Sequence, residues 1–449
     1  MKRPEQRQMK LGLSMRYLGY HDAAWRHPEV PSDGASSYRH FLRCARRAEE
    51  GRFDMVFFAD GIGVRADDNP PGSLSHSNRN VELEPLTLLA ALAPMTEHIG
   101  LVTTASTTYN EPYHIARKFA SLDQISGGRA GWNIVTSWSQ QEAWNFSRDS
   151  HLDYDTRYER AAEFVEVVTG LWESWEPGAF TRNKETGEYY DPARLHTLHH
   201  KGKHFQVRGP LNVDRTPQGR PLLVQAGANE AGQEIAAAHA DVVYASALEL
   251  APAQAYYAAL KARMPKHGRD PDHLLVMPAL VPLVGRTRAE AQAKFDQLQE
   301  LIDPLVGLAG IHVQMGDLSG HPLDGPVPEP VNAPVRSLAY KWWEKARAEN
   351  MTIRQFYTAH AGGGGLQAIG TASDIADLME EWIEQRGADG FNVTPTHLPH
   401  GIDDFVEHVV PELQRRGVFR REYESTTLRG NLGLPDYRSK WEQGRAGSA

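Results

Sequence analysis

Residues 126–145 read SGGRAGWNIVTSWSQQEAWN, and this stretch indicates how the chain is built. Glycines at its start allow a turn, after which residues 132–136 alternate large, polar and β-branched side chains as a strand does. Asn, Thr and Ser residues crowd the point where this predicted strand ends. Polar side chains at a strand end usually serve a site, so the ends of the other strands become the places where chemistry is expected.

The pattern of strand followed by helix recurs along the chain. Short apolar runs read as strands, and amphipathic stretches with apolar residues every three to four positions lie between them. Eight such runs occur, at 11–15, 54–60, 99–106, 128–136, 222–227, 241–246, 274–284 and 390–395. Eight strand–helix repeats are typical of a (β/α)8 barrel. We therefore predict an α/β fold, with one TIM-barrel domain over residues 1–449.

Three segments do not fit the simple repeat. Residues of about 176–212 are polar and turn-rich, and residues of about 316–365 begin with a run rich in Pro and Gly, so both are predicted to be long loop insertions. Long loops of a barrel usually shape its site. The C-terminal extension, residues 419–449, has too few apolar residues to fold alone. We expect it to pack on the barrel or on a neighbouring subunit.

The composition excludes several classes of protein. A formal net charge of -9 argues against a general binder of nucleic acid or anionic membrane, since both need a basic surface. Cys44 is the one cysteine, which excludes a disulfide framework and a thiolate metal site, and its amphipathic surroundings predict a buried helical thiol. The N-terminus lacks an apolar signal region and no window approaches a membrane span of roughly 18 apolar residues, so we expect a cytoplasmic protein.

Polar residues that follow the predicted strands are the candidates for chemistry. They form hydrogen bonds but include few acids, and Asp60 stands alone as a carboxylate, which weakens a glycosidase interpretation. Asp60 also suits a helix cap or a turn before Gly61. No HExxH or HxH pair follows a strand, so we predict no metal ligands. The candidates are His21, Asp60, Thr103 to Thr107, Asn133, Thr136, Ser137, Gln225, Tyr244, Ser246 and Asn392.

A second signal is the run VQAGANEAGQEIA at 224–236, which reads as strand, Gly-containing turn and helix. This arrangement places the free N–H groups of a helix N-terminus at the barrel mouth, where they can bind a phosphate. The alternative is an ordinary helix cap by Asn229. No GxGxxG follows a strand, so the sequence does not predict a Rossmann module for NADH.

Several ordered motifs together resemble one family across nearly the whole chain. They are SGGRAGWNIVTS, DTRYERAAEF (155–164), LLVQAGANEAGQEIAA, GTASDIADLMEEW with GADGFNVTP, and LRGNLGLP. The chain resembles the bacterial-luciferase-like flavin monooxygenases, in the branch of nitrilotriacetate monooxygenase component A and dibenzothiophene-sulfone monooxygenase. The resemblance implies the oxygenase component of a two-component system. A separate NADH-dependent reductase would supply reduced FMN, and the barrel would use O2 to oxidise a small organosulfur, amine or halogenated compound through a flavin hydroperoxide.

The resemblance also implies roles for particular residues. His21 and His312 would be catalytic, because a neutral imidazole can donate a hydrogen bond to a reacting oxygen. Phe58, Trp138 and Tyr244 would wall a dry substrate pocket, although aromatic residues here also suit an ordinary barrel core. The family often has Ser where Asn229 stands, which leaves the N–H of that position as the expected contact. The implied FMN-binding residues are Asp60, Thr103, Thr104, Asn133, Ser137, Arg157, Tyr158, Ala228 and Asn229.

Other readings of the sequence remain open. The same barrel could serve a deazaflavin-dependent oxidoreductase, or a non-catalytic flavin-binding relative, since fold does not imply function. A metal-dependent hydrolase is disfavoured. A polyanionic aminocarboxylate substrate would call for several basic residues, to which Arg26 and Arg79 could contribute, whereas the aromatic residues suit a neutral substrate equally well. The resemblance and the C-terminal extension predict a homodimer or homotetramer.

Overall fold

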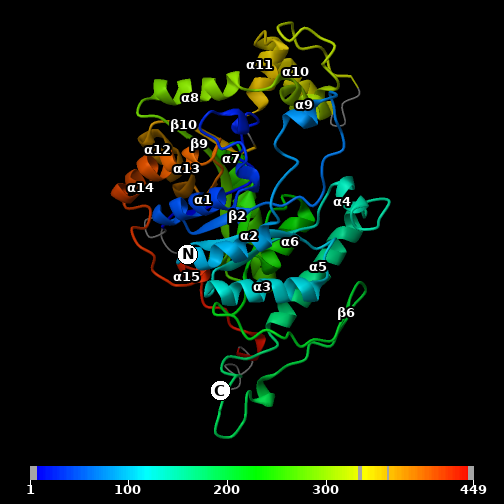
Figure 1. Cartoon of the computed structure of the whole chain (residues 1–449), viewed down its shortest axis with the longest axis vertical. Helices are drawn as coiled ribbons and strands as arrows, with labels where there is room; N and C mark the ends of the chain where they lie inside the picture. Colours follow the sequence, from blue (N-terminus) through cyan, green and yellow to red (C-terminus); the bar gives the residue numbers. More distant parts are fainter. Residues whose placement is uncertain (1–7, 332–335, 362–363, 443–449) are drawn as a thin grey trace.

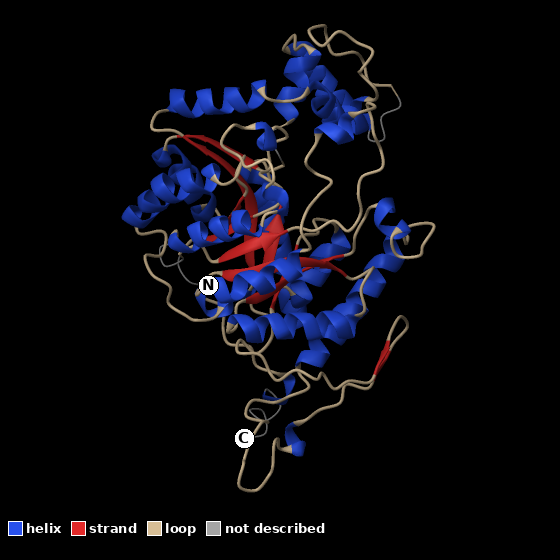
Figure 2. Ribbon diagram, in the orientation of Figure 1, coloured by secondary structure: helices blue, strands red, loops and turns tan. Residues whose placement is uncertain are grey.

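The computed structural model describes residues 8–331, 336–361 and 364–442. Within them, eight parallel strands close into a barrel, because each pairs with two neighbours and the first, β1, pairs with the last, β11. Figure 2 shows these strands at the centre of the molecule with helices around them. The barrel strands are β1 (Lys10–Ser14), β2 (Met55–Phe58), β3 (Gly100–Ser106), β4 (Ala130–Val135), β7 (Leu222–Gln225), β8 (Val242–Ala245), β9 (Leu275–Val284) and β11 (Gly390–Val393). The predicted TIM barrel is confirmed, and each predicted run overlaps one of these strands.

Three further strands were not predicted. β10 (Leu366–Gly370) pairs in parallel with the second half of β9, beyond the part of β9 that belongs to the barrel. It directly follows a glycine run, so its short apolar pattern reads as the end of a loop. β5 (His200–Lys201) and β6 (Gln206–Val207) form a small antiparallel hairpin away from the barrel.

Helices cover the outside of the barrel, and none of those described is long and apolar enough to cross a membrane. Cys44 is fully buried in α1, as predicted, and burial raises the pKa of its thiol to about 12. The helices are α1 (Tyr38–Glu50), α2 (Pro85–Leu92), α3 (Pro112–Ser126), α4 (Gln140–Trp144), α5 (Tyr154–Trp172), α6 (Glu230–His239), α7 (Leu250–Arg263), α8 (Arg288–Glu300), α9 (Pro304–Met315), α10 (Arg336–Ala348), α11 (Ile353–His360), α12 (Ala372–Glu384), α13 (His400–Asp404), a π-helical segment (Phe405–Val409), α14 (Val410–Arg416) and α15 (Leu428–Asn431).

The alternating side chains predicted for residues 132–136 face the two sides of β4. One set packs on the surrounding helices and the other points into the barrel. The ring of Trp132 faces outward and contacts the rings of Phe119 on α3 and Phe164 on α5, with centroids 6.0 and 5.9 Å apart. Asn133, the next residue, is buried and donates a hydrogen bond to Thr104 on the neighbouring strand β3. Successive side chains of a strand point to opposite faces, so one strand supplies both the outer core and the polar interior.

The insertion of about 176–212 does not shape the cavity described below. It follows α5 and precedes β7, so it lies at the end of the barrel where the strands begin. Figure 1 shows it, with β6, hanging below the barrel and away from α9, α10 and α11. Its histidines bind structural partners: His200 contacts Glu163 at 2.9 Å, and His196 contacts Glu176 at 2.7 Å. The expectation that this loop lines the site is therefore wrong.

The insertion of about 316–365 is only partly loop. Residues 316–331 are irregular, but α10 and α11 follow and pack with α9 through a small core of buried side chains that includes Ile311, Phe356 and Tyr357. The Pro and Gly residues at its start hide this helical part in the sequence.

The C-terminal extension packs across the opposite end of the barrel, although its last residues, 443–449, lie outside the described part. Leu428 and Leu432 join the apolar cluster of the barrel interior. Arg429 forms an ion pair with Asp241 at 2.9 Å, where both side chains are buried. Burial alone would raise the pKa of Asp241, but Arg429 and Arg220 outweigh it and lower that pKa to about 2. The extension thus closes the end of the barrel that faces away from the cavity.

Candidate active site

A cavity of about 1080 Å³ opens where the barrel strands end. The residues that follow β1, β4 and β7 form one side of it, and α9 with the segment 60–82, which follows β2, forms the other. His76, from this segment, contacts Asp303 at the start of α9 at 2.8 Å, which joins the two outer walls. The parallel barrel brings these residues together because the carboxyl ends of all its strands lie on one face.

One corner of the cavity holds the N-terminus of α6. The side chain of Asn229 accepts a hydrogen bond from the N–H of Gly232 at 2.8 Å and donates one to the hydroxyl of Tyr158 at 2.6 Å. Gly227 and Gly232 allow the turn to lie close to the helix, because a Cβ atom on Gly227 would lie 3.1 Å from the Cα of Gly232. Helix N-termini carry N–H groups without helical acceptors and a partial positive charge, so this corner suits an anion. Asn229 therefore both caps the helix and lines the cavity.

The end of β4 forms the adjoining wall. Ser137 has a left-handed backbone, with φ of 58°, and its buried hydroxyl donates to Ser106 at 2.8 Å. Its carbonyl accepts a hydrogen bond from the guanidinium of Arg157, whose Nε is buried and has no partner among the described residues. A non-glycine residue in this backbone conformation costs about 1–3 kcal/mol, and such residues cluster at functional sites. Arg157 thus retains a donor for a ligand beside the start of α6.

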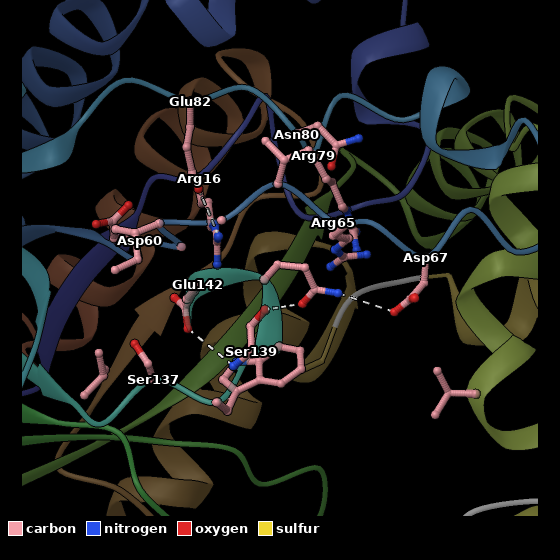
Figure 3. Close-up of a pocket in the computed structure, with 18 of the residues that line it drawn as sticks. Arg16, Asp60, Arg65, Asp67, Arg79, Asn80, Glu82, Ser137, Ser139 and Glu142 are labelled. Atoms are coloured by element: carbon pink, nitrogen blue, oxygen red, sulfur yellow. Dashed lines mark hydrogen bonds and ion pairs between the residues drawn. The ribbon is translucent and has the colours of Figure 1, made fainter. Parts of the chain in front are cut away.

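Asp60 lies across the cavity with an unusual charge environment. Burial is the main cause that raises its pKa from 3.8 to about 7, and the neighbouring carboxylates of Glu82 and Glu84 act in the same direction. Arg16 opposes this shift, but its guanidinium is already held by Glu82 through contacts of 3.2 and 3.1 Å. Figure 3 shows Arg16 and Glu82 joined above Asp60. Near neutral pH, Asp60 can therefore take up or release a proton.

A basic wall lies on the segment that follows β2. Arg65 and Arg79 line the cavity, and Figure 3 shows both side chains on the same wall. Arg79 forms an ion pair with Asp22, whereas no ion pair of Arg65 is found among the described residues. Burial raises the pKa of Asp22, although Arg79 and Arg65 both oppose that rise. Asp22 therefore neutralises part of the positive charge of this wall, by pairing with Arg79.

The comparisons with known proteins agree with this geometry. A model of the luciferase-like monooxygenase family matches residues 19–390. The chain belongs to the luciferase-like monooxygenase family. It is 49% identical over 437 residues to N-acetyl-S-(2-succino)cysteine monooxygenase of Bacillus subtilis (strain 168), covering 96% of this chain and 97% of that protein. It is 47% identical over 438 residues to nitrilotriacetate monooxygenase component A of Aminobacter aminovorans, covering 95% and 97%.

Among solved structures, the riboflavin lyase determined with modified FMN and riboflavin superposes with a TM-score of 0.82 at 31% identity. The match covers 98% of this chain and 99% of that one. The predicted family, its nitrilotriacetate monooxygenase branch and the prediction of an enzyme are confirmed, and the protein is a luciferase-like monooxygenase.

The cavity of this monooxygenase brings together only some of the residues that the sequence nominated. Trp138 is 83% exposed, so it stands at the cavity mouth and is not part of a closed wall. His312, on α9, lines the cavity, and its Nδ1 is buried with no partner among the described residues. The strand-end, catalytic and flavin candidates that line the cavity are Asp60, Thr136, Ser137, Trp138, Arg157, Tyr158, Gln225, Asn229 and His312.

Other nominated residues lie in the barrel core. Thr104 points inward and donates to the carbonyl of Phe58 at 3.0 Å, while Thr103, one residue earlier, is fully buried on the other face of β3. Phe58 packs outward on Phe41 of α1, at 5.6 Å between centroids, so it cannot wall the cavity. The ring that points inward is Phe57, which stacks on Tyr244 at 5.4 Å. The core interpretation therefore describes Phe58 and Tyr244 better than the pocket interpretation.

His21 and Ala228 also lie outside the cavity lining. The Nδ1 of His21 accepts the N–H of Ala23 at 3.1 Å, and its ring meets Phe295 of α8 edge to face. Burial lowers the pKa of His21 to about 4, so its imidazole is neutral, but the side chain faces α8. Asp22, the next residue, lines the cavity instead.

The sequence interpretation missed the segment 61–82, which contributes more of the cavity than any nominated loop. A signal for it exists, since DGIGVRADDNPPGSLSHSNRN is a long polar run directly after a predicted strand, which is where barrel loops form sites. Arg65 was missed with it. Arg16 and Glu82 were missed because each is the other's partner and 66 positions separate them.

The raised pKa of Asp60 predicts a pH-dependent stability. Between pH 4 and 7 the folded protein binds a proton that the unfolded chain releases, so this group makes the folded state less stable as the pH rises. Asp60→Asn should remove that effect. The unfolding free energy of the variant minus that of the unsubstituted protein, measured by urea denaturation, should be more positive at pH 8 than at pH 5.

The control is Asp67→Asn, which removes another carboxylate from the same cavity. An Asp60→Asn difference that is the same at both pH values would contradict the proton uptake assigned to Asp60.

Proposed function

We propose that this monooxygenase is the oxygenase component of a two-component system, using reduced FMN and O2 to oxidise a small organic compound. The observation that carries the proposal is the anion corner, where the N-terminus of α6, Tyr158 and the unpartnered Nε of Arg157 meet at one cavity. A flavin mononucleotide ends in a phosphate, which such a corner suits. The modified FMN of the related riboflavin lyase supports the same cofactor.

The residues of the cavity have distinct parts in this proposal. Arg157, Tyr158 and the α6 amides, with Ala228 and Asn229 at the turn, would hold the phosphate. Ser137 and Asp60 would contact the rest of the flavin, with Thr104 and Asn133 supporting the barrel floor beneath it. When bound, reduced FMN supplies the activation of O2 and the transfer of one oxygen atom. The protein orients the reactants and limits the entry of water.

His312 is the proposed proton donor or acceptor on the substrate side. It lies on α9, across the cavity from the strand ends, and its Nδ1 lacks a protein partner among the described residues. A half-buried imidazole in this position can exchange a proton with an oxygenated product. His21 does not line the cavity, so we propose that it packs against α8 and takes no part in proton transfer.

The proposal also covers the reductase that the protein would need, its oligomeric state and its place in the cell. The name of nitrilotriacetate monooxygenase component A supports a system with a further component, and we assign NADH oxidation to a separate flavin reductase. Assembly as a homodimer or homotetramer and a place in the cytoplasm remain predictions of the sequence.

For the substrate, we propose an amine or thioether that carries carboxylates. Two relatives at 49% and 47% identity are named for N-acetyl-S-(2-succino)cysteine and for nitrilotriacetate, and both compounds bear several carboxylates. The basic wall of Arg65 and Arg79 supplies the matching charge in this cavity. Guanidinium groups bind carboxylates through paired hydrogen bonds, so this wall favours charged over neutral substrates.

Arg157→Ala tests the cofactor site. Loss of a charge-assisted hydrogen bond of about 1.5–3 kcal/mol should weaken the binding of reduced FMN by roughly 10- to 100-fold. Anaerobic titration followed by protein fluorescence measures this affinity. Arg117→Ala, which removes an exposed arginine of α3 outside the cavity, is the matched control and should bind normally. Equal affinities of the two variants would remove the basis for the phosphate corner.

Arg65→Ala tests the substrate class. In an assay with a flavin reductase, NADH and FMN, the KM for nitrilotriacetate or N-acetyl-S-(2-succino)cysteine should rise by about 10-fold or more, with a smaller change in kcat. Arg26→Ala is the control, because Arg26 contacts the carbonyl of Leu301 outside the cavity lining. An unchanged KM in Arg65→Ala, or faster turnover of a neutral thioether than of either compound, would exclude the carboxylate preference.

A further inference from the structure

A cluster of histidines lies beside the barrel mouth but outside the cavity. His27 and Glu29 belong to the segment between β1 and α1, and His397 and His400 follow β11. The two segments leave the barrel together because β1 and β11 are paired strands. Three backbone hydrogen bonds of 2.8 to 3.0 Å then keep residues 18–21 alongside residues 395–398. Residues about 370 positions apart in the sequence thereby lie close together.

The ligand atoms of this cluster are close enough to share an ion. One nitrogen of His27, one of His397 and one carboxylate oxygen of Glu29 lie within 4.8 Å of one another. The Oε2 atom of Glu29 is 3.9 Å from the Nδ1 of His27 and 3.8 Å from the Nδ1 of His400. Around a tetrahedral zinc ion with bonds of about 2.0–2.2 Å, ligand atoms lie about 3.3–3.6 Å apart. Coordination needs these atoms to approach by about 0.5 Å. It also needs the rings of His27 and His397, which lie 4.4 Å apart with 34° between their planes, to turn toward one ion.

The orientation of the imidazoles suits a metal. The side chain of His397 is buried. The hydroxyl of Thr396 contacts the Nδ1 of His397 at 3.0 Å, which fixes the ring and leaves Nε2 for a ligand. The Nδ1 of His400 is buried without a hydrogen-bond partner among the described residues.

We propose that His27, Glu29, His397 and His400 form a binding site for a divalent transition-metal ion, for which zinc is the probe. Three imidazoles and one carboxylate favour zinc, cobalt or nickel over magnesium and calcium, which prefer oxygen ligands. Nearby Lys294 does not oppose the ion with a free charge, because its ammonium contacts Asp404 at 2.7 Å. The site differs from the sequence expectation, which found no metal ligands.

The ion would act on the cavity only through the backbone. The segment that carries His27 also carries Arg16, Tyr17 and Asp22, which line the cavity. A metal that joins this segment to the end of β11 would fix that wall in place. Its role is therefore structural, and it does not depend on the flavin chemistry of the neighbouring site.

The test is zinc binding to the full chain, purified without an affinity tag and freed of metal with a chelator. Isothermal titration should give one zinc per chain, and cobalt should give the visible absorption of a low-symmetry, nitrogen-ligated ion. His27→Gln, Glu29→Gln and His400→Gln should each weaken zinc binding by at least about 10-fold. His267→Gln is the matched control, because His267 pairs with Glu234 at 2.7 Å elsewhere on the surface, and it should bind zinc normally.

Thermal unfolding separates binding from loss of fold. Without metal, the three variants should melt close to the unsubstituted protein. Zinc should raise the melting temperature of the unsubstituted protein and of His267→Gln more than that of the three variants. Absence of saturable binding would overturn the proposal and leave a stacked histidine pair, since the rings of His27 and His397 lie 4.4 Å apart. Binding that survives in all three variants would also overturn it, because the zinc would then lie elsewhere.

Discussion

The closure of the parallel barrel by the pairing of β1 with β11 is the constraint on which the rest of the structure depends. Once the strands run parallel around a closed barrel, every strand ends on one face, and segments from residue 16 to residue 313 meet there around one cavity. The same constraint assigns the other connections to the opposite face. The long segment 176–212 and the C-terminal extension lie there, and Leu428 and Arg429 close the barrel from that side.

Positive charge and the carboxyl of Asp60 lie in different parts of the cavity, and the side chains around each explain this. The anion corner at α6 and the basic wall of Arg65 and Arg79 lie on different elements, so the two can bind different parts of a cofactor and a substrate. Asp60 lies near carboxylates, and Arg16 is already engaged by Glu82, so this wall favours a proton over a negative charge. One cavity therefore combines two regions that carry positive charge with one carboxyl, Asp60, whose pKa burial raises to about 7.

The sequence predicted most of the fold because the barrel strands are short apolar runs with regular spacing. A strand, a glycine turn and a helix N-terminus form a local signal, which placed Asn229 at the barrel mouth. Arg157 and Tyr158 came from the family resemblance, and Tyr158 does contact Asn229. It failed where a shift of one position along a strand decides whether a side chain points into the barrel or out of it. A strand reverses faces at each residue, so Phe58 and Thr103 point away from the interior although Phe57 and Thr104 point into it. It also failed for contacts between distant loops, such as His27 with His397, which no local pattern reveals.

The most direct test of the account compares the anaerobic binding of reduced FMN and reduced riboflavin to the unsubstituted protein. The two differ only in the phosphate, which the account assigns to the N-terminus of α6 and Arg157. We predict one reduced FMN per chain and an affinity for reduced riboflavin that is at least about 10-fold weaker, as expected for the loss of charge-assisted hydrogen bonds. Equal affinities, or binding of a reduced deazaflavin in place of FMN, would contradict the assignment of this cavity to FMN.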